Sequence, residues 1–239
     1  MKHTHIFLVV LLCLTWVTSL SAQSKPGLDT SLIPMYGGIE KDVGQKIADA
    51  EFVAEAGKLA GSRQKASEEF VKKGWEAFFS KRDLMMAMRR FNQAWLLNPE
   101  NSDVLWGFGV LSGAMNKIDD SVDFLRQASE KLNDNARVLN DLGFSLTIAA
   151  DLCGDPDESL KMLKEAHGCF ARAEKIEPAY EPLYSNWAIT LFYARQYAIA
   201  WEKVTKAEQL GGKTLNPMFL RDLEAKMPRP RNQQEEEKP

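Results

Sequence analysis

The stretch Met88–Pro99 reads MRRFNQAWLLNP, and its pattern decides the fold. With Ala87 before it, the stretch places a small residue, Phe91, a second small residue, Ala94, and a helix-breaking Pro99 at fixed intervals. The pattern recurs downstream at spacings of 34, 45 and 34 residues. Self-similarity at a period of about 34 residues indicates an array of helical hairpins. The four columns are Ala87, Ser121, Ala166 and Ala200; Phe91, Leu125, Phe170 and Val204; Ala94, Ala128, Ala173 and Ala207; and Pro99, Asn133, Pro178 and Gly212.

A fifth column of small residues lies upstream in each unit, in the first helix of the predicted hairpin. A larger side chain there would push the two helices apart, because protein interiors are closely packed. The Phe91 column is expected to fill the wedge between successive units. The small residues are Gly74, Gly109, Gly143 and Ala188. The predicted helices span residues 68–79 and 84–97, 103–115 and 119–132, 181–194 and 197–209, and a capping helix spans 217–226.

The chain resembles the tetratricopeptide repeat family over residues 67–212, and MRRFNQAWLLNP closely matches the second helix and closing turn of such a repeat. With MYGG at Met35–Gly38 and WGFG at Trp106–Gly109, it is also similar to a group of exported bacterial tetratricopeptide proteins. The resemblance implies an all-α, right-handed α-solenoid of about four hairpins, with an N-terminal helical extension and a C-terminal capping helix. The chain departs from the family pattern at Ser121, Asn133 and Gly212, and in the length of its third repeat.

The third repeat carries eleven extra residues between Gly143 and Ala166. Asp155, Pro156 and Glu158 have the order of an N-cap, a first-turn proline and a capping-box glutamate. The insertion is therefore predicted to lengthen the first helix by about one turn and the second by about two. The hairpin would then project past its neighbours. It is either a contact surface for a partner or a tolerated elongation.

The two ends of the chain differ in composition from the repeats. Residues 1–22 combine Lys2, an apolar run over 6–17 and small residues up to Ala22, which predicts a secretory signal peptide. The protein is therefore expected to be exported, to a periplasm or as a secreted protein. Residues 23–66 are predicted as an N-terminal extension of loop plus helix, 67–227 as the solenoid with its capping helix, and 228–239 as a disordered tail. No other stretch is apolar enough for membrane insertion.

Cys153 and Cys169 are the two cysteines that remain after the signal segment. An even pair in an oxidising compartment is compatible with a disulfide. Two separate, small thiols on packed helices are the alternative.

In the tetratricopeptide family the first helices of the repeats line a concave groove, and the resemblance implies particular groove positions. In this chain those positions are mostly aromatic. The Lys, Asn and Arg set that binds a C-terminal carboxylate in chaperone adaptors is missing, since Val71 and Trp75 occupy its first two places. The candidate protein-binding residues are Trp75, Phe78, Trp106, Arg137, Asn140, Phe144, Phe192 and Tyr193.

Aromatic side chains exposed in a groove need a cover, and three covers are compatible with the sequence. One is an apolar segment of a partner, docked on aromatic anchors. Another is the segment Leu28–Ile39 of this chain. The third is burial of the aromatics between the repeats.

These features predict an exported, non-enzymatic scaffold or adaptor that binds a protein or peptide in an aromatic groove. The alternative is a structural subunit or an immunity-type inhibitor in an envelope complex, acting through the long third hairpin. No catalytic residue, cofactor or metal is expected, since His167 is the only histidine after residue 22. The net charge of −3 and the absence of a basic stripe argue against a nucleic-acid partner.

Overall fold

The computed structural model describes residues 29–230, and within that range the chain is an all-α solenoid. The predicted signal segment 1–22 and residues 231–239 of the predicted tail lie outside the described residues. Two short 3-10 helices, η1 (Thr30–Leu32) and η2 (Pro34–Gly38), precede the α-helices. The α-helices are α1 (Val43–Ala60), α2 (Arg63–Phe79), α3 (Leu84–Leu97), α4 (Ser102–Ala114), α5 (Ile118–Lys131), α6 (Ala136–Leu152), α7 (Pro156–Ile176), α8 (Glu181–Tyr193), α9 (Tyr197–Gln209) and α10 (Pro217–Lys226).

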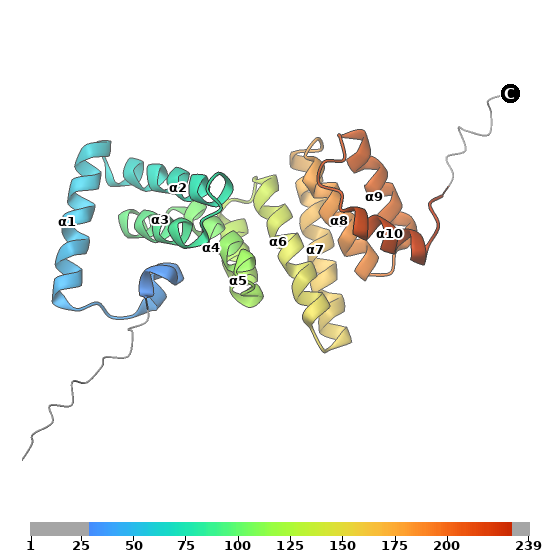
Figure 1. The fold of residues 1–239 in the computed structure, drawn as a ribbon, viewed down its shortest axis with the longest axis horizontal. Helices are drawn as coiled ribbons and strands as arrows, with labels where there is room; N and C mark the ends of the chain where they lie inside the picture. Colours follow the sequence, from blue (N-terminus) through green and yellow to red (C-terminus); the bar gives the residue numbers. More distant parts are fainter. Residues whose placement is uncertain (1–28, 231–239) are drawn as a thin grey trace, which may run out of the picture.

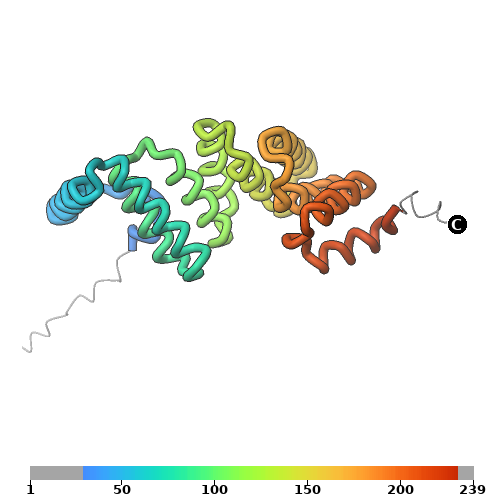
Figure 2. The backbone as a smooth tube through the Cα atoms, turned by 90° about the horizontal axis from the view of Figure 1, so that it is seen from above, coloured from blue at the N-terminus to red at the C-terminus, as the bar shows by residue number. Residues whose placement is uncertain are grey.

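The helices pack as four consecutive hairpins, α2–α3, α4–α5, α6–α7 and α8–α9 (Figure 1). α1 precedes the first hairpin, and α10 follows the last one. Seen from above, they follow one another along a curved path from the blue end to the red end (Figure 2). The observed bounds match the predicted ones within one or two residues, except that α2 begins earlier, at Arg63. The reason is local: Gly61 ends α1 in the left-handed conformation, and the Ser62 side chain then caps α2.

The glycines of the upstream column meet the Phe91 column inside each of the first three hairpins. A Cβ at Gly74 would lie 2.9 Å from Cζ of Phe91, and one at Gly143 would lie 2.8 Å from Cζ of Phe170. Phe91 also packs on Gly107 of the next hairpin, where a Cβ would overlap its ring. Phe91 is fully buried. Its ring therefore joins the first hairpin to the second, as the spacing of the columns predicts.

The third hairpin is elongated in the predicted way. α6 has 17 residues against 13 in α4, and α7 has 21 against 14 in α5. Asp155 caps α7, and Pro156 begins it. The hairpin extends beyond its neighbours in Figure 1. Leu163 is buried in the extension, whereas Leu152 and Leu160 stay 67% and 48% exposed, so the tip carries apolar surface.

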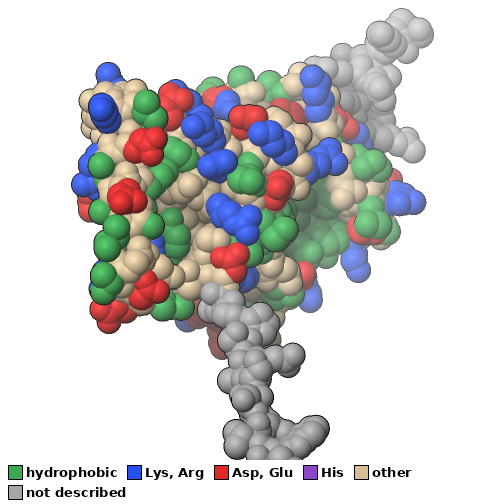
Figure 3. All heavy atoms as spheres, turned by 60° about the vertical axis from the view of Figure 1, so that its left-hand side comes forward, with side chains coloured by type: hydrophobic (Ala, Val, Ile, Leu, Met, Phe, Trp, Pro, Cys, Tyr) green, Lys and Arg blue, Asp and Glu red, His purple; other side chains and the backbone are tan. Residues whose placement is uncertain are grey.

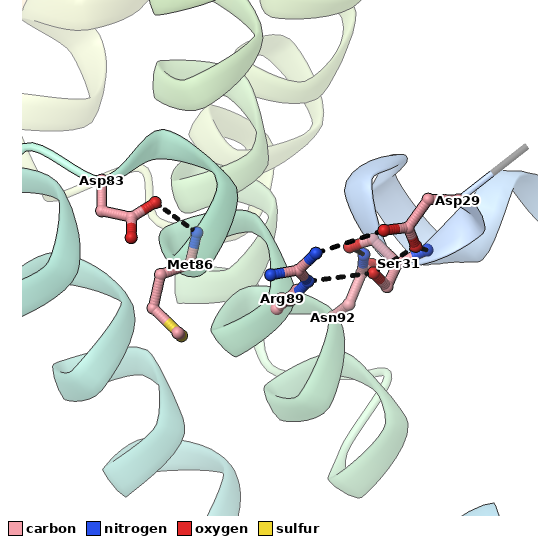
Figure 4. A network of polar contacts seen from close by, with 6 residues as sticks. All are labelled: Asp29, Ser31, Asp83, Met86, Arg89 and Asn92. Atoms are coloured by element: carbon pink, nitrogen blue, oxygen red, sulfur yellow. Dashed lines mark hydrogen bonds and ion pairs between the residues drawn. The ribbon is translucent and has the colours of Figure 1, made fainter.

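The segment before α1 docks on α3, the second helix of the first hairpin (Figure 4). The Asn92 amide donates to the carbonyls of Ser31 (2.9 Å) and Ile33 (2.8 Å), and its oxygen accepts from the Tyr36 N–H (3.4 Å). Met35 and Tyr36 have φ of 53° and 56°, a left-handed conformation that costs roughly 1–2 kcal/mol per non-glycine residue. The fully buried Asn92 offsets this cost by holding the turn.

α1 is the least covered helix, with no buried residue among its 18. Figure 3 turns this end toward the viewer and shows apolar side chains on the surface among charged ones. Asp42 fixes the start of α1 through a capping box with Gln45. Within residues 29–230, no helix has the length and hydropathy needed to span a membrane.

At the other end, α10 covers the last hairpin as predicted. Leu223 of α10 is fully buried, and the Trp201 Nε1–H donates to the Met227 carbonyl at 2.9 Å. Arg229, inside the segment predicted as a disordered tail, forms an ion pair with Glu208 and lies over the Trp201 ring. The two cysteines are separate thiols in the structure: Cys169 is buried on α7, and Cys153 follows the end of α6.

The contact between Phe91 and Gly107 predicts that a larger residue at position 107 destabilises the fold. Gly107→Ala should lower the free energy of unfolding by about 1–3 kcal/mol, because the added methyl group overpacks the core against Phe91. Gly168→Ala is the matched control: it lies inside α7 with open space around it, and alanine there should stabilise by about 1 kcal/mol through helix propensity. Urea unfolding of both variants measures the difference, and equal stabilities would contradict the assigned packing.

Candidate functional site

The first helices of all four hairpins line one cavity of about 530 Å³. α2, α4, α6 and α8 contribute most of the wall, and the turn before α8 and the loop after α9 complete it. The cavity therefore lies on the side of the first helices, where the sequence predicts a groove. The lining residues are Trp75, Phe78, Phe79, Trp106, Val110, Arg137, Asn140, Asp141, Tyr180, Pro182, Asn186 and Thr214.

One wall of the cavity is aromatic. Trp75 and Trp106 approach to 4.9 Å between ring centroids, although they belong to different hairpins. Phe79 stacks on Trp75 at 5.6 Å and remains 69% exposed. Trp75, Phe78 and Phe79 share one face of α2 because residues three and four apart are neighbours on a helix.

A second wall of the cavity is polar and centres on Asp141, beside the Trp106 indole. Its carboxylate accepts a hydrogen bond from Nε1–H of Trp106 at 2.8 Å and another from the Asn140 amide at 3.0 Å. The Asn140 oxygen in turn accepts from the Asn186 amide at 3.1 Å. Burial raises the pKa of Asp141 to about 6, against the lowering effect of these two hydrogen bonds and of Arg137. Asp141 thus joins α6 to α4, and Asn140 joins α6 to α8.

Arg137 lies at the same wall but is held by other partners. Its guanidinium forms an ion pair with Glu177 at 3.7 Å and lies 5.2 Å from the ring centroid of Tyr180. Burial, together with the charge of Asp141, raises the pKa of Tyr180 to about 12, so this phenol is neutral at physiological pH. The polar wall offers one carboxylate, one paired guanidinium, one phenol and two amides.

A second cavity of about 260 Å³ adjoins the first. Val110 and Asp141 line both cavities, so they form the boundary between the two. The second cavity is apolar, and it contains Phe144 and Ile148. Together the cavities form a path over α4 and α6, from a chamber with an aromatic wall to a smaller, mostly apolar one.

The predicted site residues divide into three groups. Trp75, Phe78, Trp106, Arg137 and Asn140 line the first cavity, and Phe144 lines the second. Phe192 and Tyr193 line neither. The rings of Tyr197 and Phe219 lie 5.6 and 5.8 Å from Phe192, so it packs under α10 instead.

Among the lining residues, the sequence reasoning missed Asp141, Tyr180, Asn186 and Thr214. Asp141 stands one position after the expected groove residue Asn140, and Tyr180 lies in a turn outside the first helices. The signal for Asp141 was a carboxylate beside Asn140 in the otherwise apolar stretch VLNDLGF, residues 138–144. Residues 29–39 do not cover the cavity, since they dock on α3. This placement argues against the second of the three covers that the sequence left open, in which residues 28–39 lie in the groove. Leu28 lies outside the described residues.

No protein-family model matches the sequence, and no curated protein matches it either. Solved structures do match. TTC0263, a thermophilic TPR protein of Thermus thermophilus, has a TM-score of 0.59 at 15% identity, over 68% of this chain and 84% of its own. PilF of Pseudomonas aeruginosa has a TM-score of 0.54 at 20% identity, over 69% of this chain and 70% of its own. YrrB, described as a TPR protein with an unusual peptide-binding site, has a TM-score of 0.50 at 19% identity, over 71% of this chain and 85% of its own.

The chain has the tetratricopeptide repeat fold. The sequence resemblance over 67–212 is confirmed at the level of the fold. In this tetratricopeptide array the two cavities lie on the first helices, and the N-terminal segment lies on a second helix.

The raised pKa of Asp141 predicts a pH dependence of stability. The folded carboxyl keeps its proton up to about pH 6, whereas an unperturbed Asp loses it near 3.8. The folded state therefore binds more protons between these values, and its free energy of unfolding falls as pH rises through that window. This stabilisation is complete below about pH 3.8 and is lost above about pH 6.

The measurement is urea unfolding at a series of pH values, for the wild type and for Asp141→Asn. The difference in unfolding free energy between the two proteins should change in the window and stay flat above it. Carbon-13 NMR of the Asp141 carboxyl gives its titration midpoint directly, and a midpoint near 3.8 would refute the assigned burial. The groups that face this carboxylate are Trp106, Arg137, Asn140 and Tyr180. Trp106 and Asn140 have no titratable group, and burial raises the pKa of Tyr180 to about 12.

Proposed function

We propose that this protein is an exported, non-enzymatic scaffold that binds a peptide segment of a partner protein in the two cavities. The observation that carries the proposal is the aromatic wall. Trp75 and Trp106 come from different hairpins and meet at one chamber, and Phe79 stays largely exposed beside them. Clustered aromatic side chains in a concave site are typical anchors for a docked segment.

Three further observations support the proposal. YrrB, which shares the fold, is described as having a peptide-binding site. The cavity wall consists mainly of aromatic and amide side chains, which are binding groups rather than nucleophiles. Export rests on the sequence of residues 1–22, with its charged start, apolar run and small-residue end.

Phe79→Ala tests the groove with little risk to the fold, because the Phe79 side chain is mostly exposed. Selection of random dodecapeptides on the immobilised protein should enrich a common motif. Peptides with that motif should bind Phe79→Ala about tenfold more weakly, since an aromatic anchor contributes about 1 kcal/mol or more to binding. Isothermal titration calorimetry measures the loss.

Leu59→Ala is the matched control, because Leu59 is an exposed apolar residue on α1, outside both cavities. It should bind the selected peptides like the wild type. The groove assignment fails if no motif is enriched, or if Phe79→Ala binds as tightly as Leu59→Ala.

The tip of the third hairpin favours a second candidate function. Leu152 and Leu160 are exposed at the projecting end, and apolar side chains gathered on a surface often mark a contact with another protein. On this alternative the protein is a structural subunit or an immunity-type inhibitor of an envelope complex, and its interface is the tip rather than the groove.

The two candidates predict opposite results for a native complex. If the tip is the interface, Leu152→Ser/Leu160→Ser should abolish co-purification of a partner from extracts of the source organism, and Phe79→Ala should leave it intact. The reverse pattern favours the groove. Circular dichroism of both variants checks that the helices are preserved.

A further inference from the structure

We propose that the boundary between the two cavities is a subsite for a basic side chain: a lysine or arginine of the bound peptide lies along the aromatic wall and donates to the Asp141 carboxylate. This inference rests on the proposed function, since it names the chemistry of the peptide that the groove takes. Its ligand is a segment with a basic residue next to an apolar one.

The Asp141 carboxylate has hydrogen-bonding capacity that the protein does not use. An ionised carboxylate offers about four acceptor positions. Two are used, by Trp106 and by Asn140, and both donors are neutral. Among residues 29–230 Asp141 forms no ion pair. A desolvated carboxylate without a cation is unfavourable, and a donor with positive charge would relieve that cost.

Arg137, the cation of the protein that acts on Asp141, is paired with other groups. Arg137 reaches Glu177 and lies over the Tyr180 ring. Its charge lowers the pKa of Asp141 less than the two hydrogen bonds do. The protein therefore supplies a partly buried acid and holds its own nearby base away from it.

The surface beside the carboxylate is aromatic. Trp106 donates its indole N–H to Asp141, so the ring is fixed next to the acid. Trp75 packs on Trp106, and Tyr180 lines the same cavity. Aromatic faces attract cations, most strongly where water is excluded. The aliphatic stem of lysine or arginine also packs well on such a wall while its head reaches a polar group.

The two cavities adjoin each other at Asp141. Asp141 and Val110 border both, so a peptide that runs from one into the other passes over the carboxylate. The second cavity, with Phe144 and Ile148, takes an apolar side chain of the same peptide. The expected motif is thus a basic residue followed or preceded by an aliphatic or aromatic one.

A purely structural role for Asp141 is the competing explanation. On that view the carboxylate only fixes the Trp106 ring, and the groove reads apolar residues alone. The two explanations differ in whether the peptide must carry a charge, and they can be separated on the wild-type protein without any substitution.

The experiment uses fluorescent peptide pools in which one position is fixed and the others are random. The fixed residue is arginine, its neutral isostere citrulline, norleucine or glutamate, and fluorescence anisotropy gives the affinity. The arginine pool should bind at least about tenfold more tightly than the citrulline pool, as expected for a charge-assisted hydrogen bond at a desolvated acid. The glutamate pool should bind most weakly.

Asp141→Asn removes the charge and keeps an acceptor for the Trp106 indole, so it should abolish the preference for arginine. Asp134→Asn is the matched control, because Asp134 is exposed in the turn before α6 and lines neither cavity. It should keep the preference.

Equal binding of the arginine and citrulline pools to the wild type would overturn the inference and leave the groove function standing. A preference for arginine that survives in Asp141→Asn would also overturn it. If no pool binds at all, the proposed function fails together with the inference. Because the arginine and citrulline comparison needs only the wild type, the test holds even if a variant does not fold.

Discussion

The fold depends on one ring held between two backbones. Phe91 fits between Gly74 of its own hairpin and Gly107 of the next, and neither position has room for a methyl group. Close packing of this kind leaves no slack, so the ring fixes how far apart α2, α3 and α4 lie. Leu125 on Gly109, at 2.5 Å from a hypothetical Cβ, repeats the arrangement one hairpin later. The spacing of these neighbouring helices therefore depends on the glycines that allow their close approach.

The same constraint builds the candidate site. Trp75 follows Gly74 in the sequence, and Trp106 precedes Gly107, so the two tryptophans flank the points of closest approach. The glycines draw α2 and α4 together on Phe91, and the adjacent indoles meet at 4.9 Å on the side of the first helices. Packing and recognition thus use neighbouring residues. A substitution that loosens the core at Gly107 would also move Trp106, and with it the hydrogen bond to Asp141.

The sequence predicts the parts of this structure that depend on local periodicity and on caps. The hairpins, the capping helix and the division of eleven extra residues between α6 and α7 follow from small-residue columns and from the Asp155–Pro156 start signal. The parts it missed depend on contacts between distant segments. Phe192 sits at a groove position of α8, but α10 packs over it, and the path of α10 is a property of the whole array. The role of Asp141 was missed because it depends on a hydrogen bond from the Trp106 indole of another hairpin.

The docking of residues 29–39 on α3 bears on whether this segment can cover the groove. Asn92 forms three hydrogen bonds with residues 31–36, and Met35 packs against the core beside α3. Moving this segment into the groove would exchange those bonds for water, at a net cost of about 1 kcal/mol each, and would expose the apolar side chain as well. The free energy that ties residues 29–39 to α3 therefore works against self-occupation. In the proposed complex, a segment from another molecule covers the exposed Phe79 and pairs with the Asp141 carboxylate.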